Sequence, residues 1–223
     1  MSARFDNWRS AAARLAAAMA VGGALLLAAC GGTTPSRPSA EARVAVPKEP
    51  VEVPEKAALA YERALAEMAA ENWIEAELAL EQLVLEHTGF AGPYVNLAIV
   101  YMQDGRDDEA RPALEQALAI DSAHAAANNQ YGILLRRAGE FAAAEDAYRR
   151  AIETDPQYLL AYYNLGVLLD LYLHRPAEAL EYYELYQNSL GEPDQKVGRW
   201  IIDLRRRLGA ADNAARVAQE DGQ

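Results

Sequence analysis

Apolar and small side chains recur every 34 residues between Tyr94 and Leu169. The clearest columns of equivalent positions are Leu97, Tyr131 and Leu165; Ala98, Gly132 and Gly166; and Tyr101, Leu135 and Leu169. Within one unit the apolar positions fall at i, i+3, i+4 and i+7, which places them on one face of a helix. Self-similarity at this period predicts a solenoid, in which stacked supersecondary units share one apolar interior.

Each unit also predicts a second helix. Gly105 and Gly139 interrupt the first helix at equivalent positions, and Asp107 or Asp108 can cap the helix that follows. A second apolar stripe then runs through Ala110, Leu114 and Ala117 in one copy and through Ala144, Tyr148 and Ala151 in the next. The unit is therefore a helix–turn–helix, and no segment shows the alternation that predicts a strand.

This pattern resembles the tetratricopeptide repeat, in which an aromatic residue, Leu-Gly and Tyr on one helix precede Ala, Phe and Pro. The third copy carries the resemblance on Asn128, Tyr131, Gly132, Leu135, Ala144, Tyr148, Ala151 and Pro156. It extends over roughly residues 57–189. The resemblance implies an all-α fold, an α-solenoid of about four helix–turn–helix repeats.

The two ends of the array depart from the pattern. Residues 57–87 form a degenerate first repeat in which Arg63 replaces the expected Leu, as is common where a repeat has no neighbour. The fourth repeat carries one additional residue around His174. A last helix over 193–208 is predicted to cap the array, and the tail is expected to fray. The expected boundaries are 57–190 for the repeats, 191–209 for the capping helix and 210–223 for a flexible tail.

Residues 1–29 have the pattern of an export signal. Three arginines in the first 14 residues precede an uncharged apolar run over 15–29. That run is shorter than the roughly 20 residues that a membrane-spanning helix needs. The sequence therefore predicts a signal peptide.

The single cysteine, Cys30, lies at the end of this apolar run. The segment Leu27–Cys30 resembles the bacterial lipobox, and the resemblance implies that Cys30 is lipidated and becomes the new N-terminus. The alternative is a transmembrane anchor with a buried free cysteine. Two or three acyl chains anchor a protein stably, whereas one does so only marginally. Gly31 in place of Asp implies sorting to the outer membrane, with the protein facing the periplasm.

Residues 30–56 change in composition. Half of the chain's ten prolines fall here, beside Gly, Ser and Thr, and no helical period is present. Such a segment is typical of a disordered tether. At ~3.3 Å per residue it reaches on the order of 80 Å. We therefore expect the repeat domain to be tethered to the membrane at a distance from it.

The charge of the chain limits its partners. The net charge is −12 and the pI is near 4.7. Binding of a nucleic acid backbone requires a clustered cationic surface, which this composition does not favour. Docking to anionic lipid headgroups by charge is disfavoured for the same reason.

No catalytic pattern is evident in the sequence. The three histidines fall between predicted helices, without a second ligand at i+4 and without a cysteine partner. The acidic residues lie at solvent-facing helix positions, and neither a Gly-rich phosphate loop nor a nucleophile elbow is present. We therefore predict a protein that is not an enzyme and that uses no cofactor and no metal.

The resemblance implies a binding groove lined by the first helix of each repeat, at its second, fifth, ninth, twelfth and thirteenth positions. The last four of these positions carry Val95, Ile99, Met102 and Gln103 in repeat two; Asn129, Ile133, Arg136 and Arg137 in repeat three; and Tyr163, Val167, Asp170 and Leu171 in repeat four. Tyr61 and Leu65 extend the column into repeat one. Exposed apolar columns of this kind are typical of partner-binding surfaces.

Two alternatives explain the apolar column without a partner. It can pack between neighbouring helices, or the protein's own tether can occupy it. A carboxylate clamp of paired Lys and Asn, which some tetratricopeptide proteins use for chaperone tails, is disfavoured because only Asn96 matches. The run Arg205–Arg207 offers a second contact site for an acidic partner, or it complements the helix dipole in the last turn of the chain's last helix.

The predicted function is that of an outer-membrane scaffold that binds envelope proteins in this groove. The combination of lipobox, Pro-rich tether and repeats resembles small lipoproteins of type IV pilus assembly, which implies a role in localising or assembling a secretin. The alternatives are a modulator of cell-wall synthesis or hydrolysis enzymes, or an accessory of a TonB-type transport system.

Overall fold

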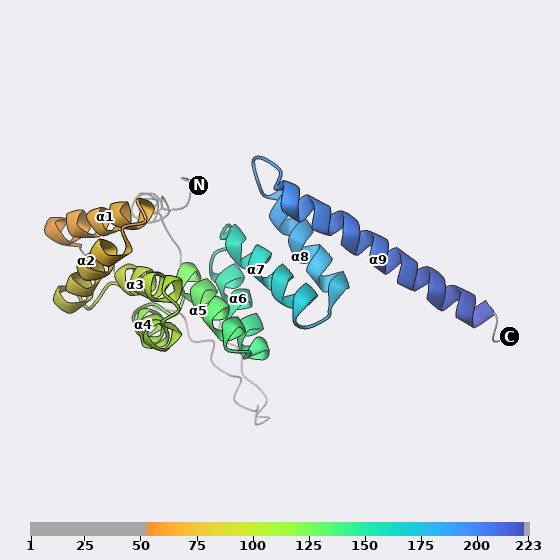
Figure 1. Cartoon of the computed structure of the whole chain (residues 1–223), viewed down its shortest axis with the longest axis horizontal. Coiled ribbons are helices and arrows are strands. Elements are labelled where there is room, and N and C mark those ends of the chain that lie inside the picture. Colours follow the sequence, from red (N-terminus) through yellow and green to blue (C-terminus); the bar gives the residue numbers. More distant parts are fainter. Residues whose placement is uncertain (1–52, 221–223) are drawn as a thin grey trace, which may run out of the picture. The chain divides into compact units, whose positions relative to one another are not determined.

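The computed structural model describes residues 53–220, with side chains to residue 211. The predicted signal peptide, Cys30 and nearly all of the predicted tether lie outside the described residues. Within 53–220 every regular element is a helix (Figure 1). The helices are α1 (Glu55–Ala69), α2 (Trp73–Glu86), α3 (Ala91–Gln103), α4 (Asp107–Ile120), α5 (Ala125–Arg137), α6 (Phe141–Thr154), α7 (Leu159–Leu171), α8 (Pro176–Asn188) and α9 (Gln195–Glu220). None of them is both long and apolar enough to cross a membrane.

The helices form four consecutive hairpins that stack in chain order. Each odd-numbered helix from α1 to α7 packs against the next helix, and each hairpin packs against its successor through α2–α3, α4–α5 and α6–α7. The buried residues of one hairpin continue into the next, as the core around Leu135, Tyr148 and Leu165 shows. The predicted all-α solenoid of four repeats is therefore confirmed.

The turn within each hairpin uses the same backbone conformation. Gly105 and Gly139, the two predicted breaks, adopt φ of +75° and +79°. The equivalent positions in the first and fourth hairpins are Glu71 and His174, at φ of 61° and 53°. This left-handed conformation ends the first helix, and glycine adopts it without steric cost. The extra residue predicted around His174 lies in this turn, so the hairpin geometry is kept.

Two boundaries differ from the prediction. The helix α1 begins at Glu55, inside the segment assigned to the linker. The helix α9 begins at Gln195 and continues to Glu220, so the expected end of the helix at Leu208 is wrong. The residues after Gly209 are rich in alanine and contain no proline, and alanine has the highest helix propensity. As a result Arg205–Arg207 lie in the middle of α9, and the interpretation that they complement its C-terminal dipole is wrong.

Candidate partner-binding groove

The first helices of the hairpins lie closer to one another than the second helices do. Direct packing joins α3 with α5 and α5 with α7, whereas the second helices make no comparable contact with one another among the described residues. The array therefore curves with the first helices on its inner side. We call the surface formed by α1, α3, α5 and α7 the inner groove.

Four branched aliphatic residues run across this groove, one on each first helix. They are Leu65, Ile99, Ile133 and Val167, spaced 34 residues apart, and each is half-buried. Their flanks pack into the cores between hairpins while part of each side chain stays open to solvent. We call these four residues the aliphatic row.

Three of the predicted groove residues are buried instead. Val95 is 3% exposed and packs in the cluster of Ala91, Ala117 and Ala127. Met102 is buried beside Leu134. For both, packing between neighbouring helices explains the apolar side chain, and little of either remains for a partner.

Asn129, the third of these, takes part in a contact between repeats. It is 1% exposed, and its Oδ1 accepts a hydrogen bond from Asn164 Nδ2 at 2.9 Å. A contact between equivalent positions joins repeats one and two, where Asn96 Nδ2 donates to the Tyr61 hydroxyl. Burial raises the pKa of Tyr61, which keeps the phenol protonated. Asn96 thus joins two repeats in this structure.

The basic residues of repeat three are held by neighbours. Arg136 Nε lies 3.3 Å from the Tyr148 hydroxyl, its Nη1 lies 3.2 Å from the Tyr172 hydroxyl, and the guanidinium stands over the Tyr172 ring. Arg137 forms an ion pair with Asp107 at 2.9 Å and donates to the Met102 carbonyl at 3.1 Å. Arg136 stays half-exposed, so the groove keeps one basic position at its centre.

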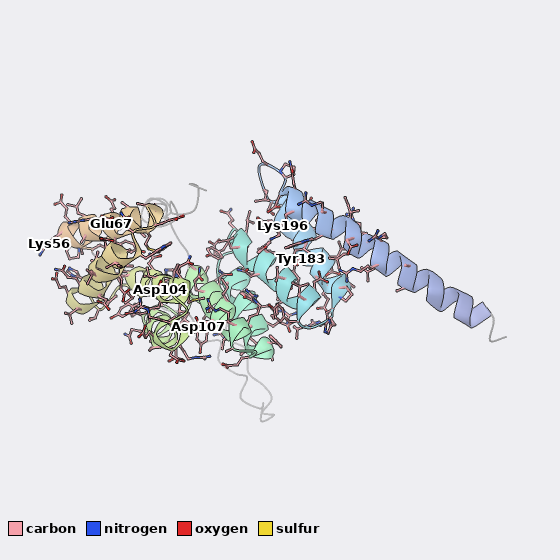
Figure 2. The ribbon with its side chains drawn as sticks, viewed as in Figure 1. Lys56, Glu67, Asp104, Asp107, Tyr183 and Lys196 are labelled. Atoms are coloured by element: carbon pink, nitrogen blue, oxygen red, sulfur yellow. The ribbon has the colours of Figure 1, made fainter. Side chains whose placement is uncertain are left out.

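At the fourth repeat the groove meets α9. Tyr163 stacks on Trp200 with ring centroids 6.0 Å apart and an interplanar angle of 25°. Asp170 forms an ion pair with Arg207 at 3.1 Å. Lys196 lies on the first turn of α9 (Figure 2). Its Nζ lies 4.7 Å from the Trp200 ring centroid. The sequence analysis singled out Arg207 within the run Arg205–Arg207 but missed Lys196 and Trp200 as neighbours of the groove, because it treated this part of the helix as a cap.

The three histidines lie at helix ends or in a turn. His87 follows the last residue of α2, and His174 occupies the hairpin turn. His124 is the N-cap of α5, where its Nδ1 accepts a hydrogen bond from the Ala127 backbone N–H at 3.2 Å. Within the described range, no group of three or more His, Cys, Asp or Glu side chains is arranged to hold a metal ion.

Comparisons with known proteins agree with this architecture. Two models of the tetratricopeptide repeat family match residues 89–157 and 129–193. The type IV pilus assembly protein PilF of Pseudomonas aeruginosa is 30% identical over 118 residues, which are 51% of this chain and 45% of that protein. The chain therefore spans less than half of the length of this curated relative.

Solved structures show the same fold. The structure of Pseudomonas aeruginosa pilF has a TM-score of 0.64 at 23% identity, covering 73% of each chain. MamA has a TM-score of 0.55 at 22% identity, covering 69% of this chain and 88% of its own. YrrB, described as a tetratricopeptide protein with an unusual peptide-binding site, has a TM-score of 0.51 at 23% identity and covers 63% and 71%. With the period, the hairpins and the turns described above, the two family models establish that the repeat region of this chain, residues 89–193, belongs to the tetratricopeptide repeat family.

Proposed function

We propose that this protein is an adaptor that binds a segment of a partner protein in its inner groove. The observation that carries the proposal is the aliphatic row, because it keeps one branched side chain partly exposed on each of the helices α1, α3, α5 and α7. A row of this kind fits apolar side chains of an extended or helical segment. Burial of each such side chain contributes roughly 1.5–3 kcal/mol.

The decisive experiment places a photo-crosslinking amino acid at Ile133, in the middle of the row. In living cells we expect one crosslinked product, and mass spectrometry of that product identifies the partner. The double variant Ile99→Glu/Val167→Glu should abolish the product, because two buried carboxylates would then face the partner's apolar side chains. Circular dichroism should show unchanged helical content.

A matched control has the same charge change on the opposite side of the array. Ala119 and Ala142 are exposed positions on α4 and α6. The variant Ala119→Glu/Ala142→Glu should leave the crosslinked product unchanged. Persistence of the product in Ile99→Glu/Val167→Glu would show that the inner groove is not the binding surface.

The proposal includes a lipid anchor at Cys30 in the outer membrane, with the repeats in the periplasm. It is supported by the apolar run that ends at the only cysteine and by Gly31 after it. Cells grown with labelled palmitate should incorporate label into the natural protein, and the variant Cys30→Ser should incorporate none. Label in Cys30→Ser would exclude this anchor.

The pathway that we propose is type IV pilus assembly. Its support is the 30% identity to PilF over 118 residues. A deletion strain should lose surface pili, and expression of the natural protein should restore them. Restoration by Ile99→Glu/Val167→Glu to the same level would contradict a role of the groove in that pathway.

A further inference from the structure

The helix α9 continues the array as a fifth first helix. The first helices α3, α5 and α7 begin 34 residues apart, and α9 begins 36 residues after α7. Contacts between earlier first helices join residues 35 apart, as in Asn129 with Asn164. The contacts of α7 with α9 join residues 37 apart, Tyr163 with Trp200 and Asp170 with Arg207. Both differences are two residues, so the same positions meet, and α9 occupies the place of the next first helix.

This alignment assigns groove positions to α9. The second, fifth, ninth, twelfth and thirteenth positions are Lys196, Arg199, Asp203, Arg206 and Arg207. The equivalent positions of α3 are Gly92, Val95, Ile99, Met102 and Gln103. The groove therefore changes from an aliphatic surface on α1–α7 to a mostly basic one on α9.

The basic side chains of this segment reach into solvent. Lys196 and Arg199 are exposed, and the Arg206 side chain is 80% exposed. Two carboxylates lie among them: Asp203 pairs with Arg206 and Arg207, and Asp170 pairs with Arg207. Four cations against two carboxylates leave an excess of positive charge, to which the half-exposed Arg136 adds.

The rest of the array has the opposite charge. The net charge of the chain is −12, and residues 53–87 carry eight carboxylates against two basic side chains. A cationic segment on an acidic protein attracts a carboxylate locally, while the remaining surface repels one. Charge complementarity of this kind fixes the direction in which a partner binds more than it adds affinity.

We propose that the inner groove binds a protein segment in which aliphatic residues are followed, or preceded, by a cluster of Asp or Glu. The aliphatic part contacts the aliphatic row, and the acidic part lies against Lys196, Arg199 and Arg206 of α9. This inference rests on the function proposed above and adds the chemistry of the ligand and the end of it that lies against α9.

A random 12-residue peptide library tests it. The purified full chain is held in lipid nanodiscs of phosphatidylcholine, so that anionic headgroups do not compete. Peptides selected on the natural protein should be enriched in aliphatic residues and in a cluster of acidic residues at one end. Replacing the acidic residues of a selected peptide by Gln or Asn should weaken binding about five- to tenfold, measured by fluorescence anisotropy.

Two variants locate the acidic preference. Arg199→Glu/Arg206→Glu should remove the acidic enrichment and keep the aliphatic one. The matched control Arg150→Glu/Arg205→Glu makes the same charge change away from the groove, because Arg150 is exposed on α6 and Arg205 pairs with Glu184 of α8. This control should select the same peptides as the natural protein.

The outcomes separate the two proposals. Peptides that depend on Ile99 and Val167 but carry no acidic enrichment overturn the inference about α9 and leave the groove function standing. Acidic enrichment that survives Arg199→Glu/Arg206→Glu also overturns it. Enrichment of no peptide that depends on Ile99 and Val167 counts against both. Binding of the full chain to nanodiscs with anionic lipid, lost in Arg199→Glu/Arg206→Glu, would assign the basic segment to the membrane surface instead.

Discussion

At the residue scale, the two helices of each hairpin meet at a pair of residues, one small and one large, whose sizes complement each other. The small position on the first helix and the large position on the second are paired as Ala64 with Leu80, Ala98 with Leu114, Gly132 with Tyr148, and Gly166 with Tyr183. Alanine faces leucine in the first two repeats, and glycine faces tyrosine in the last two. The combined volume is thus held nearly constant, as close packing of protein interiors requires.

The pairing predicts the effect of one methyl group. A Cβ at Gly132 would lie 2.6 Å from Cε1 of the fully buried Tyr148, so the ring or the backbone would have to shift. Gly132→Ala should therefore destabilise the protein by about 1–3 kcal/mol in urea unfolding. Adding Tyr148→Leu should recover part of that loss, because it restores the Ala–Leu pair of repeat two.

The control for this substitution is Gly198→Ala on α9. No atom lies within 4 Å of a Cβ at Gly198, so the change should be neutral or stabilise by up to about 1 kcal/mol. A Gly132→Ala protein as stable as Gly198→Ala would refute the size pairing.

His124 makes the cap of α5 sensitive to pH. Burial lowers the pKa of His124 from 6.5, against the opposing effect of Asp121. The neutral ring accepts a hydrogen bond from the Ala127 N–H. The folded-state pKa is below the unfolded one, so this contribution is complete above pH 6.5 and is lost as pH falls through the folded-state value. His124→Asn keeps an N-cap acceptor that does not titrate. Between pH 7.5 and 5.5, the natural protein should lose more unfolding free energy than His124→Asn, and equal losses would contradict this role.

At the element scale, ion pairs of alternating direction join successive second helices. The fifth residue of one second helix forms an ion pair with the residue that immediately precedes the second helix of the next hairpin. The three pairs are Glu77 with Arg106, Arg111 with Glu140, and Glu145 with Arg175. The sign changes at each step, so a hairpin matches its own neighbour and repels a hairpin shifted by one repeat. Such alternation favours a single order of stacking.

Reversal of one charge in this series tests the alternation. Arg111 Nη2 lies 2.6 Å from Glu140 Oε1, and both side chains are partly exposed. Arg111→Glu should destabilise the protein by about 1 kcal/mol, because the ion pair is replaced by two carboxylates. Arg111→Glu/Glu140→Arg should restore most of the loss. A double-mutant cycle in urea gives the coupling energy, and a value near zero would show that the pair does not stabilise the stack.

At the scale of the whole molecule, α9 closes the core of the last repeat. Val197, Ile201 and Leu204 are buried with Leu165, Leu169 and Tyr183 in one cluster. A solenoid gains stability from contacts between nearest neighbours, so loss of this contact weakens the array from its end.

Alanine substitutions at two residues that are close in sequence on α9 distinguish the effect of burial on stability from the effect of helix propensity. Leu204→Ala removes a side chain that is 0% exposed and should cost about 2–5 kcal/mol. Ile202→Ala changes a side chain that is 68% exposed and should change stability by less than about 0.5 kcal/mol. Thermal unfolding followed by circular dichroism measures both. Equal melting temperatures would show that α9 is not packed on the repeats.

The sequence by itself determined the helix pairs, their turns and their order, because each follows from local rules that the 34-residue period repeats. Gly105 and Gly139 end helices through their own backbone freedom, and the stripes around Leu97 and Ala110 follow from helix geometry. The aliphatic row was also readable, since it has the same period.

The tertiary structure decided which groove positions stay open and what α9 does. Val95 and Asn129 lie on the predicted face but are buried, because the distance between neighbouring helices sets exposure and no local pattern encodes that distance. Two additional residues before α9 break the 34-residue period, so counting along the chain does not align it with the first helices. Only the contacts of Trp200 with Tyr163 and of Arg207 with Asp170 place α9 in the groove.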